Sequence, residues 1–300
     1  MKRNNWLSFK CPISLHGIIL TKACFQEIKI NLLIGLICGV IGFNIFITPS
    51  IEKSVTFYPI KEINQTPTSK NIDYKDIYLT TADNIKINGW YIDNPSSNEV
   101  ILFLHGNGGN IQNTIGFIDY FYQFPIDFFV IDYHGYGKSG GELSEANLYL
   151  DTNAAYNYLI NDKKYSPKQI ILVGWSLGAN LALNLASKEQ VGAVVSIASI
   201  TSAKEISDHF IPFYIRPFIW ERSNFNVINI IDKITAPILF MHSKNDNLIP
   251  YNMSLALYEK ANKPKYLIPL NGGNHSTLEL TPEITNKLKY FILNKKLDLP

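Results

Sequence analysis

Short, almost wholly apolar runs recur along most of the chain and are separated by polar stretches. Such runs are typical of parallel strands that are covered on both faces of a sheet. They occupy residues 100–104, 128–131, 169–173, 193–197, 238–241 and 266–269. Helical patterns lie between and after them, at residues 144–160, 177–186 and 281–293. This alternation predicts an α/β fold with a mostly parallel central sheet and helices on both faces.

Turn and cap residues support several of these elements. Residues 76–81 and 85–92 flank Asp83-Asn84, a pair that tolerates positive φ, and so predict a hairpin. Ser144 is a good N-cap for its helix, and Pro282 suits the first turn of the last helix.

The N-terminal region carries a separate apolar run. Residues 32–47 are apolar except for three glycines and Asn44, and with Ile28 and Ile30 the run can cross a bilayer as one helix. Thr48-Pro49 ends it. We expect residues 1–29 to be a cytoplasmic segment, 30–48 a transmembrane helix, 49–70 a linker and 71–300 the main domain. A buried helix and a late signal peptide remain alternatives.

Charge around this run predicts its orientation. The residues before it carry a net charge of +4, whereas residues 48–70 carry +1. The positive-inside rule then places the N-terminus in the cytoplasm and the main domain across the membrane. The glycosylation sequons at Asn252 and Asn274 favour a bacterial periplasmic face, because a glycan at Asn274 would crowd the loop there.

Composition narrows the classes further. The 300 residues are 46% hydrophobic with a formal net charge of +2, which gives no indication of a nucleic-acid surface. The cysteines are Cys11, Cys24 and Cys38, so the main domain has neither a disulfide nor a cysteine-ligated metal.

The most informative motif is Gly174-Trp175-Ser176-Leu177-Gly178, which joins an apolar strand directly to a helix. This is the setting of a nucleophile elbow, a sharp turn that presents a serine at the carboxyl end of a sheet. The glycines remove side chains that would collide across the turn. The motif alone is also compatible with an ordinary small-residue turn; the flanking strand and helix favour the elbow.

A serine nucleophile needs a base and a carboxylate that orients the base. Asp246 and His275 follow Ser176 in the order expected for this arrangement, each in a polar loop after one of the last two strands. His242 abuts its strand and His209 lies in an irregular aromatic segment, so we interpret both as structural. The backbone N–H groups of Leu177 and Asn107 are the candidate oxyanion donors. Asp132 is expected to hold backbone amides and His105 to hold its loop.

An aromatic insertion of about residues 201–230 separates two of the strands, and we call it the cap. We expect it to roof an acyl pocket above Ser176, formed by Phe210, Phe213, Tyr214 and Trp220. A lid that packs on the core without contacting substrate is the alternative.

Together these segments resemble the α/β-hydrolase superfamily, and most closely the membrane-anchored serine hydrolases that include the eukaryotic bud-emergence-type proteins. The resemblance spans about residue 55 to the C-terminus. It rests on Thr80-Ala82-Asp83 with Gly89-Trp90, His105-Gly106-Asn107, Gly135-Tyr136-Gly137-Lys138-Ser139, the Ser176 elbow, Asp246 with Ile249-Pro250, and the residues from Gly272 to His275.

This resemblance implies a Ser176–Asp246–His275 triad, an N-terminal transmembrane anchor and no cofactor. Asn84, His134 and Ser243 depart from the family pattern, and Ser243 could shift the Asp246 loop. Substrate is not implied, because the fold hosts many chemistries. We expect a carboxylesterase acting on apolar, small-molecule or lipid-derived acyl esters. A peptidase or amidase and a catalytically silent membrane-tethered interaction module are the alternatives.

Overall fold

The computed structural model describes residues 22–220 and 222–297. Its main sheet has eight strands in the order β10-β9-β8-β7-β4-β6-β3-β2, and β3 alone runs in the direction opposite to the other strands. These strands are β2 Lys75–Thr80, β3 Lys86–Ile92, β4 Val100–Leu104, β6 Asp127–Ile131, β7 Ile170–Trp175, β8 Ala193–Ile197, β9 Ile238–Ser243 and β10 Lys265–Leu270. The predicted mostly parallel α/β architecture is confirmed.

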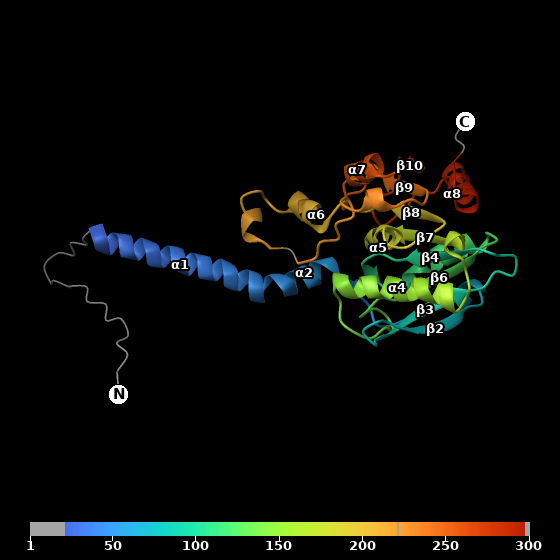
Figure 1. Cartoon of the computed structure of the whole chain (residues 1–300), viewed down its shortest axis with the longest axis horizontal. Coiled ribbons are helices and arrows are strands. Elements are labelled where there is room, and N and C mark those ends of the chain that lie inside the picture. The colour runs from blue at the N-terminus through green and yellow to red at the C-terminus, as the bar shows by residue number, and fades with distance from the viewer. Residues whose placement is uncertain (1–21, 221, 298–300) are drawn as a thin grey trace.

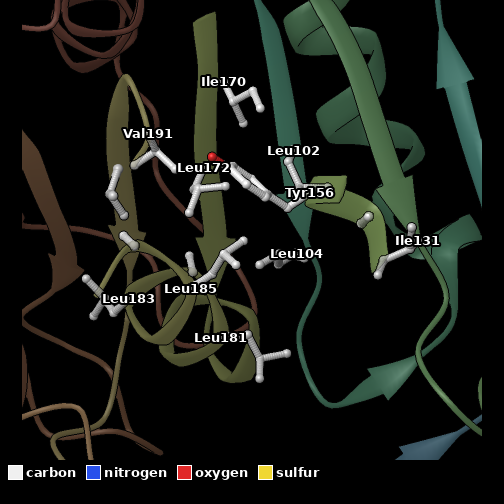
Figure 2. Packing of buried hydrophobic residues seen from close by; sticks show 14 of the residues in the cluster. Leu102, Leu104, Ile131, Tyr156, Ile170, Leu172, Leu181, Leu183, Leu185 and Val191 are labelled. Carbon is white, nitrogen blue, oxygen red and sulfur yellow. The ribbon is translucent and has the colours of Figure 1, made fainter. Parts of the chain in front are cut away.

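Helices cover both faces of this sheet (Figure 1). Alternate residues of one strand therefore enter two cores: Leu102 and Leu104 of β4 face one side, and Ile101 and Phe103 face the other. Figure 2 shows the first core, where strand leucines pack against Leu181 and Leu185. The helices of the main domain are α3 Ile115–Tyr122, α4 Glu145–Asn161, α5 Leu177–Ala186, α6 Ala203–Phe210, α7 Tyr251–Lys260 and α8 Pro282–Asn294.

Local signals in the sequence have the expected structural roles. The β2–β3 pair is the predicted hairpin, and Asn84 in its turn has a φ of 64°. The Ser144 hydroxyl accepts a hydrogen bond from Asn147 N at 3.2 Å and so caps α4. Thr281 caps α8 in the same way, through Ile284 N at 3.3 Å.

The N-terminal helix α1 spans Lys22–Phe46, so it begins before the predicted position 30 and ends before position 48. Residues Lys29–Phe46 are long and apolar enough to cross a membrane, and 6% of that stretch is buried. In Figure 1, α1 projects away from the body. Residues 1–21, which hold most of the predicted cytoplasmic segment, lie outside the described residues.

Residues 49–70, expected to be a linker, are packed onto the body. They contain most of α2 (Thr48–Thr56) and the short strand β1 (Tyr58–Pro59). Strand β1 pairs in parallel with β5 (Gly108–Gly109), in the loop that follows β4. The chain leaving α1 therefore contacts the predicted oxyanion loop directly.

Candidate active site

Ser176 occupies the turn between β7 and α5 in a backbone conformation that side chains rarely adopt, with φ 56° and ψ −119°. Gly174 and Gly178 permit this turn, because the backbone there packs too closely to leave room for a side chain. A Cβ on Gly174 would lie 2.2 Å from Gly178 O, and one on Gly178 would lie 1.9 Å from Leu104 O. Strained backbone of this kind persists where the surrounding structure fixes it. The elbow therefore holds the Ser176 hydroxyl at the carboxyl ends of β4 and β7.

His275 comes from the loop after β10 and faces Ser176 across the sheet edge. Its Nε2 lies 3.0 Å from Ser176 Oγ, although the two residues are 99 positions apart. Its Nδ1 lies 2.8 Å from Asp246 Oδ2. A carboxylate oxygen can only accept at this distance, so Nδ1 carries the proton and Nε2 is free to accept from the serine hydroxyl.

Asp246 lies in the loop after β9, and its side chain is nearly inaccessible to solvent. Its Oδ1 accepts hydrogen bonds from Leu248 N at 2.9 Å and Ile249 N at 2.8 Å. Burial raises the pKa of Asp246, but hydrogen bonds from His242, His275 and these amides outweigh it and hold the pKa well below its usual range. The carboxylate is therefore ionised at neutral pH.

His242 contributes to this carboxylate site more than the sequence indicates. Its Nε2 lies 3.2 Å from Asp246 Oδ2 and 3.0 Å from Ile249 O, while Nδ1 lies 2.7 Å from Ser254 Oγ. Both neighbours of Nε2 are acceptors, so Nε2 carries the proton. His242 is structural, as predicted, and its specific role is to hold Asp246. A histidine four residues before the aspartate was the signal available in the sequence.

The two candidate oxyanion donors lie beside Ser176. Leu177 is the first residue of α5, so its N–H has no acceptor within the helix. Asn107 lines the same pocket as Ser176 and Leu177. The Asn107 loop is fixed by three contacts: Tyr58 N and Tyr136 Oη donate to Asn107 O, and Asn107 Nδ2 donates to Thr56 O.

A largely apolar pocket of about 500 Å³ opens beside Ser176. Of the predicted acyl-pocket residues, Phe210 lines it. Phe213, Tyr214 and Trp220 do not line it and are exposed, as is Phe210 itself. The lining also includes two α2 residues that sequence reasoning missed, Glu52 and Thr56. The remaining lining residues are Asn107, Ser176, Leu177, Asn180, Ile200, Ala203, Ile206, Ser207, Ile211, Ser223, Phe225, Leu248 and Ile249.

A second, smaller pocket of about 280 Å³ also reaches Ser176 and is lined by His275. It is lined by the loop after β4, by Asn113, Thr114 and Ser276, and by the aromatic residues Phe117 and Trp175. Ser176 thus borders a large apolar pocket and a smaller pocket of mixed character. Within residues 22–220 and 222–297, no group of three or more His, Cys, Asp or Glu residues is placed to hold a metal ion.

Comparison with known proteins places this geometry in a family. Residues 99–222 match the family model described as alpha/beta hydrolase fold. The "Uncharacterized membrane protein YNL320W" of Saccharomyces cerevisiae is 32% identical over 71% of this chain and 78% of its own. "Alpha/beta hydrolase domain-containing protein 17B" of Xenopus laevis is 30% identical over 68% of this chain and 70% of its own. The chain belongs to the α/β-hydrolase family.

Solved structures agree with this assignment at the level of the fold. The esterase Pf2001 of Pyrococcus furiosus superposes with a TM-score of 0.68 at 23% identity, over 79% of this chain and 97% of its own. The Est1E protein of Butyrivibrio proteoclasticus, solved with ferulic acid bound, gives 0.59 at 20% identity, over 72% and 98%. A hydrolase is the enzyme class that this family membership supports.

This α/β-hydrolase also buries a polar pair beneath the loop after β4. Asp132 accepts from Ile111 N at 2.8 Å, as expected of a residue that holds backbone amides. His105 Nε2 lies 3.6 Å from Asp132 Oδ1, and neither His105 Nε2 nor Asp132 Oδ2 has a hydrogen-bond partner among the described residues. Burial lowers the pKa of His105 to about 4 and raises the pKa of Asp132 to about 7. Between these values both groups are neutral, so they form no ion pair.

The pair should give opposite contributions to the pH dependence of stability. Unfolded His105 binds a proton below pH ~6.5, whereas the folded residue does so only near pH 4, so His105 lowers stability as pH falls. Asp132 keeps its proton up to about pH 7 when folded, so it lowers stability as pH rises from 4 to 7. We therefore expect Asp132→Asn to raise the slope of stability against pH above that of the native chain. His105→Gln should lower this slope below that of the native chain.

Urea unfolding of the detergent-solubilised full chain between pH 4 and 7 measures both slopes. Each change across the range should be at most about 3 kcal/mol. Slopes that shift in the same direction in the two variants would contradict the neutral pair.

Proposed function

We propose that the chain is a serine hydrolase that cleaves carboxylic esters through an acyl-enzyme intermediate. The observation that carries the proposal is the continuous hydrogen-bonded path from Ser176 Oγ to His275 at 3.0 Å and from His275 to Asp246 at 2.8 Å. A nucleophile in contact with a base, and a base oriented by a third group, is the arrangement that activates a hydroxyl.

The mechanism follows from the proton positions. His275 Nε2 removes the proton of Ser176 as Oγ attacks the ester carbonyl, and Asp246 stabilises the imidazolium that forms. The N–H groups of Leu177 and Asn107 donate to the oxyanion of the tetrahedral intermediate. His275 then protonates the leaving alcohol, and the acyl group stays on Ser176. Water, deprotonated by His275, releases the acid and restores the enzyme.

The two pockets beside Ser176 favour an ester with a long apolar acyl chain and a compact leaving group. Ile206, Phe210 and Ile211 give the larger pocket an apolar wall suited to an acyl chain. The smaller pocket, with Asn113, Thr114 and Ser276, suits a compact polar leaving group. Apolar acyl esters are therefore the proposed substrates.

A fluorophosphonate probe tests the proposal on the full chain in detergent. We expect covalent labelling of the peptide that contains Ser176, together with hydrolysis of p-nitrophenyl esters. A panel of matched esters and anilides separates an esterase from a peptidase or amidase. A folded chain that the probe does not label would instead be a silent interaction module.

Phe210 and Phe213 form a matched pair for the acyl pocket, because Phe210 lines it and Phe213 does not. Phe210→Ala should lower kcat/KM for a soluble octanoyl ester by about fivefold, since roughly 1 kcal/mol of apolar contact is lost. Phe213→Ala should change it less than about twofold. Initial rates with acetyl and octanoyl esters measure both effects. An equal loss for the two variants would place the acyl chain elsewhere.

We further propose that α1 anchors the enzyme in a membrane with residues 1–29 cytoplasmic and the catalytic domain on the far side. The apolar stretch Lys29–Phe46, the greater positive charge before it and the relative named as a membrane protein support this. If the chain is bacterial, the domain faces the periplasm. Protease added outside intact spheroplasts should then digest the domain; full protection until lysis would reverse the topology.

A further inference from the structure

The outer side of the cap exposes a group of aromatic side chains that we call the aromatic ridge. It consists of Phe213, Tyr214, Phe218 and Trp220, which are 76%, 64%, 52% and 50% exposed. None of the four lines the pocket beside Ser176. The rings of Phe213 and Tyr214 are in contact, with centroids 5.5 Å apart. Exposed apolar surface larger than one side chain marks a protein or membrane contact. We therefore expect a protein or a membrane to cover the aromatic ridge.

Hydrogen bonds tie this ridge to the last turn of α1. Asn44 Nδ2 donates to Phe218 O at 2.8 Å, and Trp220 N donates to Asn44 Oδ1 at 2.8 Å. Asn44 is 2% exposed, so these cap backbone groups satisfy a polar side chain in an otherwise apolar helix. Arg222 adds a contact from its guanidinium to Ile45 O at 3.3 Å. In Figure 1, the cap lies on the same side of the body as α1.

The depth of the ridge follows from the geometry of α1. The apolar stretch Lys29–Phe46 has 18 residues, which at ~1.5 Å per residue reach about 27 Å, against a hydrocarbon thickness of ~30 Å. Asn44 lies two residues before the end of this stretch, or about 3 Å along the axis. If α1 spans a bilayer, the segment bonded to Asn44 must lie at the bilayer boundary. Trp and Tyr favour this depth.

The apolar pocket lies between the two elements that are joined to α1. One wall is α2, which continues directly from α1 and contributes Glu52 and Thr56. The other wall is α6 of the cap. Glu52 of α2 fastens this helix to the C-terminal part of the cap, because its carboxylate accepts from Ser223 N at 2.7 Å and Arg222 N at 2.9 Å. The pocket is thus held on the side of the body that faces the anchor.

We propose that the aromatic ridge inserts into the headgroup–acyl boundary of the bilayer crossed by α1, and that the pocket between α2 and α6 takes the acyl chain of its ester from that bilayer. The first part is independent of catalysis. The second part rests on the proposed esterase function. A protein partner, including a second copy of the chain, would cover the ridge without lipid and is an outcome of the test.

Spin labels test the insertion in the full chain reconstituted in phosphatidylcholine nanodiscs. Cys11, Cys24 and Cys38 are replaced by serine, and single labels are placed at Phe213→Cys, Trp220→Cys and the control Tyr78→Cys. Tyr78 is a 54% exposed aromatic residue on β2 of the body. Oxygen concentrates in lipid and nickel chelates in water. We expect the ratio of oxygen to nickel accessibility to be about fivefold higher at 213 and 220 than at 78, as for side chains ~5–10 Å into the interface.

Two results would overturn the insertion. Nickel accessibility at 213 and 220 equal to that at 78 would leave the ridge in water. Protection of both labels from oxygen and nickel alike would show a protein contact over the ridge.

Hydrolysis rates test delivery of the acyl chain. The double variant Phe213→Ser/Tyr214→Ser should cleave an ester embedded in the nanodisc about tenfold more slowly than the native chain, because apolar contact with lipid is lost. Its rate on a soluble acetyl ester should stay within about twofold, since neither residue lines the pocket. Tyr78→Ser is the matched control. An unchanged rate on the embedded ester would overturn delivery from the bilayer.

The two proposals fail in distinguishable ways. Absence of fluorophosphonate labelling in the native chain would remove the esterase function and leave the spin-label result intact. Water-exposed labels with normal ester hydrolysis would remove the insertion alone.

Discussion

Ser176→Ala should lower kcat for a p-nitrophenyl octanoate substrate by a factor of about 10⁶ and leave the fold unchanged. The loss is this large because the hydroxyl is the atom that attacks, and His275 has no substitute group to activate at 3.0 Å. Alanine fits the site, since it keeps the Cβ and removes only Oγ. Stopped assays with the purified full chain in detergent measure the rate, and the fluorophosphonate probe should give no labelled peptide.

Ser207→Ala is the matched control for this variant. Ser207 lies on α6 and lines the same pocket, so its hydroxyl is available to a substrate but is not hydrogen-bonded to His275. Its rate should stay within about twofold of the native rate. A Ser176→Ala chain that retained native turnover would exclude the serine nucleophile and with it the acyl-enzyme.

Asp246→Asn should lower kcat by about 10⁴ with little change in KM. The asparagine amide would present donors to His275, where the carboxylate now accepts from Nδ1 at 2.8 Å. His275 would then carry its proton on Nε2 and could not accept the proton of Ser176. The amide oxygen can still accept from Leu248 N and Ile249 N, so the loop should keep its shape. Labelling at Ser176 should become slow and should not disappear.

Asp232→Asn is the control for the loss of a carboxylate, because Asp232 is exposed on a short 3-10 helix away from the site. It should leave kcat unchanged within about twofold. Full activity in Asp246→Asn would mean that another group orients His275. It would contradict the assignment of Asp246 as the carboxylate of the triad.

Continuous apolar runs in the sequence predicted the buried strands well. Runs such as 100–104 and 193–197 are apolar at every position, and both faces of β4 and β8 are indeed buried. Helix α3 was missed because its aromatic residues, including Phe117, Tyr120 and Phe121, are as typical of strands as of helices. Helix α7 follows Pro250 and was missed because its stretch has weak apolar periodicity.

In the cap, composition did not predict which aromatic residues line the pocket. Its aromatic residues suggested a pocket lining, yet Phe213, Tyr214 and Trp220 turn outward and Phe210 alone of the four lines the pocket. Composition reports that a segment is apolar, but it does not report which side faces the core. Exposure does not separate the four residues either, because Phe210 borders the pocket and is still 56% exposed.

By itself the sequence determined the parallel sheet, the turn that carries Ser176, and the kinds and order of the side chains proposed to act with it. These properties depend on local apolar runs, on glycines and on the chain order of loops after strands. Only the tertiary structure decided that α2 walls the pocket, that His242 holds Asp246, and that Asn44 bonds to the cap 174 residues away. The physical reason is that the partner of a polar side chain is fixed by where distant segments pack, and no local pattern records it.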